Sequence, residues 1–208
     1  YSKDLLLFLI RKNFIPKAIF SSTQEYTISH SNEKVKNYNF VNLKEIADEY
    51  DLPFYEIDSI DGKRVKDFDN VLEDLSLDLI LVLGWYYIIP KLIREKLKHG
   101  AWGIHASLLP NYAGGAPLNW AIINGEKKTG VTLFRLSDGV DDGDIISQKS
   151  FLIDREDTIK EVYEKATISS CQILFEAINN IQNIKYISQD KTKIKYFPQR
   201  KPEDGEID

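Results

Sequence analysis

Apolar and polar positions follow each other along the chain in blocks that predict strands alternating with helices. The block at residues 79–83 is apolar throughout, which is typical of a parallel strand covered on both faces. Over residues 158–178 the apolar side chains recur three and four positions apart, which predicts a long helix with one buried face. Further strands are predicted at 18–21, 52–57, 131–136 and 144–153. This alternation favours the α/β class, with a doubly wound, Rossmann-like and mostly parallel sheet.

The order of the predicted elements also indicates how the chain is organised. It opens on a helix, whereas a doubly wound fold normally opens on a strand, so we expect the first strand to lie upstream of Tyr1. Residues 1–180 are predicted to form the main domain. Residues 181–208 are predicted to form a short C-terminal hairpin and tail, with the turn at Asp190 and Lys191.

Composition narrows the possible partners. The 208 residues include 27 Lys and Arg against 32 Asp and Glu, a net charge of −5, which argues against a broad nucleic-acid surface. The single Cys excludes an intrachain disulfide, and no Cys/His cluster has metal-ligand spacing, so we expect no metal and a cytoplasmic location. No apolar run reaches the ~20 residues of a spanning helix, so we expect no membrane partner.

Three histidines are present, and one of them stands out by its position. His105 follows an apolar strand and enters a loop, and in open α/β sheets ligand sites gather at the carboxyl ends of strands. Taken alone, a histidine in this place is more often structural than catalytic. His30 and His99 are typical of solvated positions in a loop and at the end of a basic helix.

An acidic cluster at residues 137–144 leaves three interpretations open. It is a turn, a poor match to a calcium loop, or the source of a carboxylate aimed at His105, where it would orient the imidazole for general acid–base chemistry. The nearby Gly114 and Gly115 allow close backbone approach, yet they belong to neither a Walker loop nor a dinucleotide fingerprint.

Several short motifs together resemble one enzyme family. They are Ile-His-Ala-Ser-Leu-Leu-Pro at 104–110, Gly-Gly-Ala-Pro at 114–117, Asn-Gly-Glu at 124–126, Thr-Gly-Val-Thr at 129–132 and Val-Asp-Asp-Gly-Asp-Ile-Ile at 140–146. Over roughly residues 70–205 the chain resembles the formyl transferases that use N10-formyltetrahydrofolate. The resemblance implies a formyltransferase fold and transfer of a formyl group from that folate to an amine.

Within the family, residues 117–120 and the tail from Tyr196 resemble the sugar N-formyltransferases. That branch implies a nucleotide-linked amino sugar as acceptor, as in lipopolysaccharide O-antigen biosynthesis, with folate as the other partner, no nucleic acid and a homodimer. Three alternatives stay open: a methionyl-tRNA formyltransferase, which the net charge disfavours, a glycinamide ribonucleotide formyltransferase, and a weakly active or non-catalytic relative.

The resemblance also assigns roles to individual residues. His105 becomes the proton-transfer residue and Asp141 the carboxylate that orients it. The family's oxyanion-binding Asn stands two positions before the histidine, where this chain has Gly103. Loss of one such donor typically costs ~10²–10³ in rate. Another donor, a slow enzyme and a loss of activity are the competing explanations, and we favour another donor because His105 and Asp141 are both present.

The folate and acceptor sites carry over by position. The folate site comprises Tyr87, Ile88, Ile89, Ser107, Leu108, Leu109, Pro110, Gly115, Ser137, Asp138, Gly139, Val140 and Asp141. For the sugar nucleotide the candidates are Asn119, Trp120, Tyr196, Phe197, Arg200 and Lys201. The cations suit a diphosphate and the aromatic rings suit a base, although solvated charges and core aromatics are equally good interpretations.

Overall fold

The computed structural model divides the chain into two compact units. It describes residues 1–27, 34–37, 40–58, 60, 64–85, 87–200 and 204. The first unit comprises Tyr1–Ile80 and Gly84–Gly100, and the second comprises Leu81–Leu83 and Ala101–Asp208. Within the second unit, residues 187–197 are hydrogen-bonded to residues before 180, and the predicted boundary at residue 180 stays a prediction.

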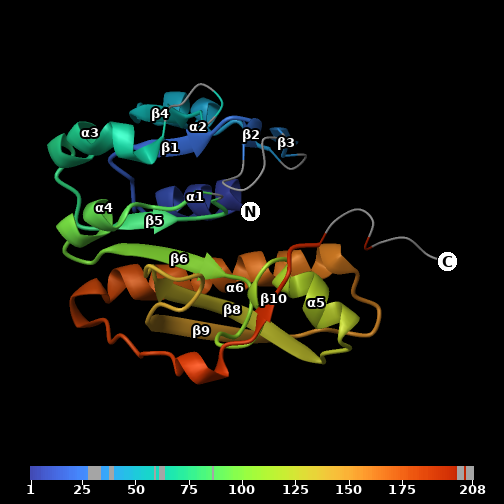
Figure 1. The fold of residues 1–208 in the computed structure, drawn as a ribbon. Coiled ribbons are helices and arrows are strands. Elements are labelled where there is room, and N and C mark those ends of the chain that lie inside the picture. Colours follow the sequence, from blue (N-terminus) through green and yellow to red (C-terminus); the bar gives the residue numbers. More distant parts are fainter. Residues whose placement is uncertain are drawn as a thin grey trace. The chain divides into compact units, whose positions relative to one another are not determined.

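The first unit carries helices and short strands in alternation (Figure 1). Its elements are α1 (Ser2–Arg11), β1 (Ile19–Ser22), β2 (Glu25–Thr27), β3 (Lys34–Lys36), α2 (Lys44–Glu49), β4 (Phe54–Ile57), η1 (Val65–Phe68), α3 (Asp69–Asp74) and α4 (Lys91–Lys96). β1 and β4 pair in parallel, whereas β2 and β3 pair antiparallel. α1 buries Leu5 and Leu9, whose four-residue spacing puts them on one helical face.

The second unit is built around a sheet with the order β5-β6-β8-β9. Its elements are β5 (Ile80–Val82), whose first residue belongs to the first unit, β6 (Ala101–His105), β7 (Ala113–Gly114), α5 (Pro117–Ile123), β8 (Lys128–Arg135), β9 (Ile145–Leu152), α6 (Ile159–Asn179), η2 (Ile181–Asn183), η3 (Lys191–Lys193) and β10 (Tyr196–Phe197). α6 packs along β8 and β9 (Figure 1). It starts at the predicted capping box, where the Thr158 backbone N–H donates to the Glu161 carboxylate at 2.8 Å.

The core strand of this unit is β8, which is buried from Thr129 to Phe134. Side chains alternate between the two faces of a strand, so both faces of β8 must be covered. α6 packs on β8, and its buried residues include Val162 and Leu174. On the face of Phe134 a second apolar cluster includes Leu109 and Ala113, which brings the loop after His105 into the core.

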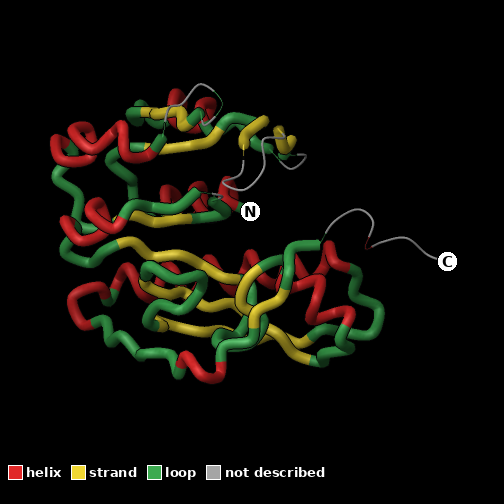
Figure 2. Tube along the Cα trace, in the orientation of Figure 1, coloured by secondary structure: helices red, strands yellow, loops and turns green. Residues whose placement is uncertain are grey.

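The α/β class predicted from the sequence is confirmed, but the second unit is more antiparallel than expected. β6 pairs antiparallel with β8, and β8 pairs antiparallel with β9. The connection between β8 and β9, residues 136–144, is short and contains no crossover helix, which a parallel pair would need. The predicted C-terminal hairpin also takes a different form. β10 pairs in parallel with β7, and Ile187 bridges to Ile145, so the segment is mostly loop and pairs with other elements (Figure 2).

None of the helices in the described ranges combines the length and the apolar character that crossing a bilayer requires.

Candidate active site

The structure brings His105 and Asp141 together. His105 ends β6 and is 9% exposed. Its Nδ1 lies 3.5 Å from Oδ2 of Asp141, and its Nε2 lies 2.7 Å from the carbonyl oxygen of Tyr112. A carbonyl oxygen only accepts hydrogen bonds, so Nε2 must carry a proton in this arrangement. Nδ1 is therefore the ring atom that can take up a proton beside the carboxylate.

The carboxylate is held by the backbone of β7. The Gly114 N–H donates to Oδ2 of Asp141 at 2.8 Å, which fixes the same oxygen that faces His105. Asp141 itself has a left-handed backbone, with φ of 51°. Such a conformation is costly for a residue with a Cβ and persists only where neighbours hold it.

Asp142 next to it is also tied down, through a different set of partners. Lys191 Nζ donates to Oδ2 of Asp142 at 2.8 Å, and the Ser137 hydroxyl donates to Oδ1. Burial opposes ionisation of the Asp142 carboxyl, but these hydrogen bonds outweigh it and lower its pKa below the ordinary value. The acidic cluster is thus a structured loop with two carboxylates in two separate networks.

The hydroxyl of Thr132 forms hydrogen bonds with the loop after His105. Thr132 pairs with His105 across β6 and β8 and is fully buried. Its hydroxyl donates to the Ser107 carbonyl at 2.6 Å and accepts from the Leu109 N–H at 3.1 Å and from Gln148 Nε2 at 2.9 Å. One donor and two acceptor positions are then all used, which leaves the hydroxyl fully satisfied.

Apolar side chains fill the space beside Gly103. This glycine lies in β6 two positions before His105, so both face the same side of the strand. A Cβ at Gly103 would meet Cδ2 of Leu136 at 2.9 Å and the ring of Phe134 at 3.3 Å. The place from which an Asn side chain would extend is therefore occupied by hydrocarbon.

The predicted folate residues fall in both units. In the second unit, Ser107 is buried and donates its hydroxyl to the Asn111 carbonyl at 2.7 Å, and Leu109 is 3% exposed. Leu108 and Pro110 are half-buried, and Val140 is exposed. The Gly139 N–H donates to the Ser137 hydroxyl at 3.3 Å, inside the acidic loop that also holds Asp138. A folate contact at these residues stays a prediction.

The first unit contains the other part of the predicted folate site. Tyr87 is half-buried and packs edge-on against Trp85, with ring centroids 5.4 Å apart. Ile88 is 82% exposed, whereas Ile89 is buried and its carbonyl accepts from Arg94 Nε at 3.1 Å. Nε1 of Trp85 is buried and has no hydrogen-bond partner among the described residues. An orphaned buried donor of this kind is rare and is expected to meet a ligand or water.

The C-terminal segment packs closely against Gly114 and Gly115, the two glycines predicted to allow close backbone approach. A Cβ at Gly114 would lie 2.5 Å from the carbonyl oxygen of Phe197, and a Cβ at Gly115 would lie 2.4 Å from Cα of Gln199. Neither position has room for a side chain. Gly115 is thus needed for the packing of this segment, and its predicted folate contact stays a prediction.

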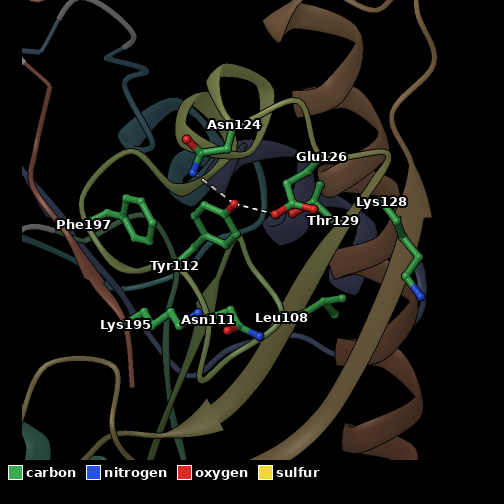
Figure 3. A pocket seen from close by; sticks show the side chains of 9 residues that line it. All are labelled: Leu108, Asn111, Tyr112, Asn124, Glu126, Lys128, Thr129, Lys195 and Phe197. Carbon is green, nitrogen blue, oxygen red and sulfur yellow. Dashed lines mark hydrogen bonds between the residues drawn. The ribbon is translucent and has the colours of Figure 1, made fainter. Parts of the chain in front are cut away.

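A cavity of about 370 Å³ is lined in part by Tyr112 (Figure 3). Its lining residues are Leu108, Asn111, Tyr112, Asn124, Glu126, Lys128, Thr129, Lys195 and Phe197. In Figure 3 the Tyr112 hydroxyl points between two polar side chains: it donates to Glu126 at 2.6 Å and accepts from Asn124 at 3.1 Å. Burial and the bond to Glu126 raise the pKa of Tyr112. The side chain of Tyr112 therefore lines the cavity, while its backbone carbonyl contacts His105.

The predicted acceptor residues mostly contact one another. Phe197 stacks on Tyr112 at 4.6 Å between ring centroids and packs against Trp120 at 5.5 Å. The Arg200 guanidinium lies 5.4 Å from the Trp120 ring, whose Nε1 donates to the Pro198 carbonyl. These contacts favour the interpretation of Trp120 and Phe197 as packing residues. Asn119 is half-buried on α5, Tyr196 is 58% exposed, and Lys201 and His30 lie outside the described residues.

Four residues of this site were not predicted. Tyr112 contacts His105 through its backbone carbonyl, and because every residue has such a group, the sequence gives no signal for it. Thr132 interrupts an apolar strand, and this polar position was the available signal. Gln148 contacts Thr132, and Gln189 donates to the Asp141 carbonyl at 2.9 Å; both reach the site from distant positions, which no local pattern shows. Across the described ranges there is no group of three His, Cys, Asp or Glu side chains that could hold a metal ion.

Comparisons of the sequence with known proteins agree on one family. A model described as formyl transferase matches residues 16–178. The methionyl-tRNA formyltransferase of Alkaliphilus oremlandii is 38% identical over 80% of this chain, and that of Thermodesulfovibrio yellowstonii is 36% identical over 83%. The chain spans about half the length of these curated relatives, 53% and 55%.

Solved structures share the fold at lower identity. A phosphoribosylglycinamide formyltransferase from Anaplasma phagocytophilum superposes with a TM-score of 0.72 at 20% identity, covering 96% of this chain and 93% of that one. A sugar 3N-formyl transferase, crystallised with dTDP and 5-N-formyl-THF, superposes with a TM-score of 0.65 at 22% identity, covering 95% and 66%.

Proposed function

The chain belongs to the formyl transferase family, and from that membership we propose that it moves a formyl group from a formylated tetrahydrofolate to a primary amine. One observation carries the proposal: Nδ1 of the buried His105 lies 3.5 Å from the Asp141 carboxylate. Acyl transfer to an amine must remove a proton from the attacking nitrogen and return one to the leaving nitrogen. A histidine oriented by a carboxylate suits both steps.

As acceptor we propose the amino group of methionyl-tRNA, the alternative that was disfavoured on charge. The identities of 38% and 36% to methionyl-tRNA formyltransferases support this acceptor more directly than fold likeness at 22% supports a sugar. A net charge of −5 is a sum over the whole chain and does not describe any one surface. The expectation that nucleic acid is absent among the partners therefore gives way.

The residues present fit a folate donor. The donor supplies an activated formyl carbon, already at the oxidation level of the product. The family resemblance implies donor contacts at the backbone of residues 87–89 in the first unit, and separately at the loop 137–141 in the second unit. Trp85, two residues before Tyr87, offers a buried N–H with no partner among the described residues, which a ligand could satisfy.

The chain's own contribution is to place and move one proton. The Tyr112 carbonyl keeps a proton on Nε2 of His105, so Nδ1 receives the proton of the attacking amine and then gives a proton to the leaving nitrogen of the folate. Asp141 stabilises the charged imidazole in between, and Gly114 keeps its carboxylate in place. Gly103 contributes no amide, so its side of the site offers less stabilisation to a developing oxyanion than an Asn would.

A nucleotide-linked amino sugar remains a second candidate acceptor because residues 117–120 and the tail from Tyr196 resemble the sugar N-formyltransferases. Both acceptors present a reactive amine. They differ in the remainder of the acceptor molecule, which the protein must also bind.

A single assay separates these possibilities. The chain is incubated with N10-formyltetrahydrofolate and methionyl-tRNA, with a panel of nucleotide-linked amino sugars, or with no acceptor. Deformylated folate is followed by absorbance and the formylated product by mass spectrometry, with the His105→Ala variant as control. We expect formyl-methionyl-tRNA from the first arm. A formylated sugar instead would replace the proposed acceptor, and product in neither arm would overturn the proposed activity.

A further inference from the structure

We propose that residues 187–197, here called the C-terminal clamp, position Asp141 against His105, and that Gln189 is the positioning residue of the clamp. Its role in turnover rests on the proposed function, while its role in placing Asp141 does not. The clamp lies beyond residues 16–178, which match the family model, and the roles that the resemblance suggests for Tyr196 and Phe197 concern the acceptor rather than Asp141.

The clamp covers the acidic loop almost residue by residue. Ile187 exchanges two backbone hydrogen bonds with Ile145, both 2.8 Å long. Other residues of the clamp also contact the loop. Ser188 Oγ donates to the Asp144 carboxylate at 2.8 Å, Lys191 Nζ donates to Asp142 at 2.8 Å, and the Tyr196 hydroxyl donates to the Val140 carbonyl at 3.3 Å. Residues 140–145 are therefore held along their whole length by one segment.

Gln189 makes the contact closest to the candidate active site. Its Nε2 donates to the carbonyl of Asp141 at 2.9 Å and to the carbonyl of Gly143 at 2.7 Å. A side-chain amide has two N–H groups on one nitrogen, which matches two carbonyls converging on one point. Its Oε1 is buried without a partner among the described residues, so the amide contributes to this contact through its donors.

The loop needs such a restraint because its backbone is strained. Asp141 has φ of 51°, a conformation that an L side chain disfavours. At Gly143 a Cβ would lie 1.8 Å from the Arg135 carbonyl oxygen, so only glycine fits. Gln189 bridges the carbonyls of these two positions and thereby opposes relaxation of the turn.

The same segment also holds the other side of Asp141. The N–H groups of Ala113 and Gly115 donate to the Lys195 and Phe197 carbonyls, both at 2.9 Å. The N–H of Gly114 between them points away from the clamp and donates to the Asp141 carboxylate at 2.8 Å. Successive N–H groups of an extended chain alternate in direction, so pairing of the flanking residues with the clamp aims Gly114 at Asp141.

Asp141 is thus fixed at its carbonyl by Gln189 and at its carboxylate by Gly114, and both restraints originate in the clamp. If either is lost, the carboxylate can move away from His105 while both catalytic side chains remain in the chain. This separates a positioning role from a catalytic one.

The test replaces the amide and keeps its shape. Gln189→Glu puts an acceptor-only group against two carbonyls, and Gln189→Ala removes the donors without adding charge. Amide hydrogen exchange of Gly114 is measured by NMR, together with kcat, KM for the formyl donor and the free energy of unfolding. Thr158→Ala, which loses the cap of α6 far along the chain, serves as a matched destabilised control.

We expect both Gln189 variants to speed Gly114 exchange and lower kcat by about tenfold, the equivalent of one ordinary hydrogen bond, with little change in KM. Thr158→Ala should leave exchange at Gly114 and kcat near wild type. Unchanged Gly114 exchange in a folded Gln189→Ala protein overturns the proposal, as does an equal effect in Thr158→Ala. If the wild type transfers no formyl group, the proposed function fails, and Gly114 exchange still decides the placement of Asp141.

Discussion

Two regions flank His105, and they are constructed in opposite ways. On the side of Asp141, the backbone and side chains of residues 137–145 are held by hydrogen bonds from the C-terminal clamp and from β7. On the side of Gly103, the space is filled by the ring of Phe134 and the side chain of Leu136. The first region is polar and restrained, and the second is apolar and offers no side-chain donor.

The contrast bears on the proposed chemistry, because proton transfer and oxyanion stabilisation need different groups. Handling of a proton needs a histidine and a placed carboxylate, and both are present in restrained geometry. Stabilisation of an oxyanion needs an aimed donor, and Gly103 supplies none. The proposed formyl transfer therefore depends more on the His105–Asp141 pair than on the apolar side at Gly103.

The largest effect is expected on the polar side, from removal of the histidine. His105→Ala should lower kcat for formyl transfer ~10²–10⁴-fold, the usual contribution of general acid–base catalysis. The fold should remain, as judged by circular dichroism. His99→Ala in the first unit is the matched control and should keep wild-type turnover. Near-wild-type kcat in His105→Ala would falsify the assignment of the proton-transfer residue.

The apolar side can be tested by giving it a donor. Gly103→Asn alone is crowded, since its Cβ would lie 2.9 Å from Leu136, so the informative variant combines Gly103→Asn with Leu136→Ala. We expect kcat to rise, by up to ~10²-fold if the new amide reaches the oxyanion. Leu136→Ala alone is the control and should show no gain. No gain in the double variant would mean that another donor already serves this position.

A third change weakens the loop that both regions share. Thr132→Val preserves shape but leaves the Ser107 carbonyl, the Leu109 N–H and Gln148 without their common partner. Buried groups left unsatisfied typically cost ~1–3 kcal/mol, which urea unfolding can measure. Thr167→Val, on the exposed side of α6, should change stability by less than about 0.5 kcal/mol. Equal effects of the two variants would remove Thr132 from the supporting network.

The smallest expected effect is the pH dependence of the clamp. Hydrogen bonds from Lys191 and Ser137 lower the pKa of Asp142, so its contribution to stability is complete above the ordinary value of 3.8 and is lost as pH falls through the lowered pKa. The stability difference between wild type and Asp142→Asn should shrink over that acid range. We expect at most about 1 kcal/mol, because Lys191 is exposed to solvent. A difference that does not vary with pH contradicts this account.

Sequence patterns predicted the class of the fold well where the pattern was long. The helix expected at 158–178 is α6, including its cap at Thr158, because twenty residues of helical spacing leave little ambiguity. The direction of β8 and β9 was missed, since an apolar strand reads the same in either direction. The C-terminal segment was expected to pair with itself, whereas β10 pairs with β7. Short strands carry too few residues to specify a partner.

The candidate site divides in the same way. The meeting of His105 and Asp141, thirty-six positions apart, follows from motifs that resemble one family, and the structure brings the two side chains together. The acceptor was expected to be a sugar nucleotide, and sequence identity to methionyl-tRNA formyltransferases favours the alternative. A net charge summed over the chain was a weak guide, because binding depends on where charges lie.

By itself, the sequence determined the fold class, the family and the identities of the residue proposed to move a proton, His105, and of the carboxylate proposed to orient it, Asp141. These depend on local periodicity and on motifs of consecutive residues, which are readable along the chain. Only the tertiary structure decided how Asp141 is held, what fills the space beside Gly103 and which carbonyl meets Nε2 of His105. Those features depend on hydrogen bonds and packing between residues far apart in sequence, whose partners are chosen by geometry once the core has formed.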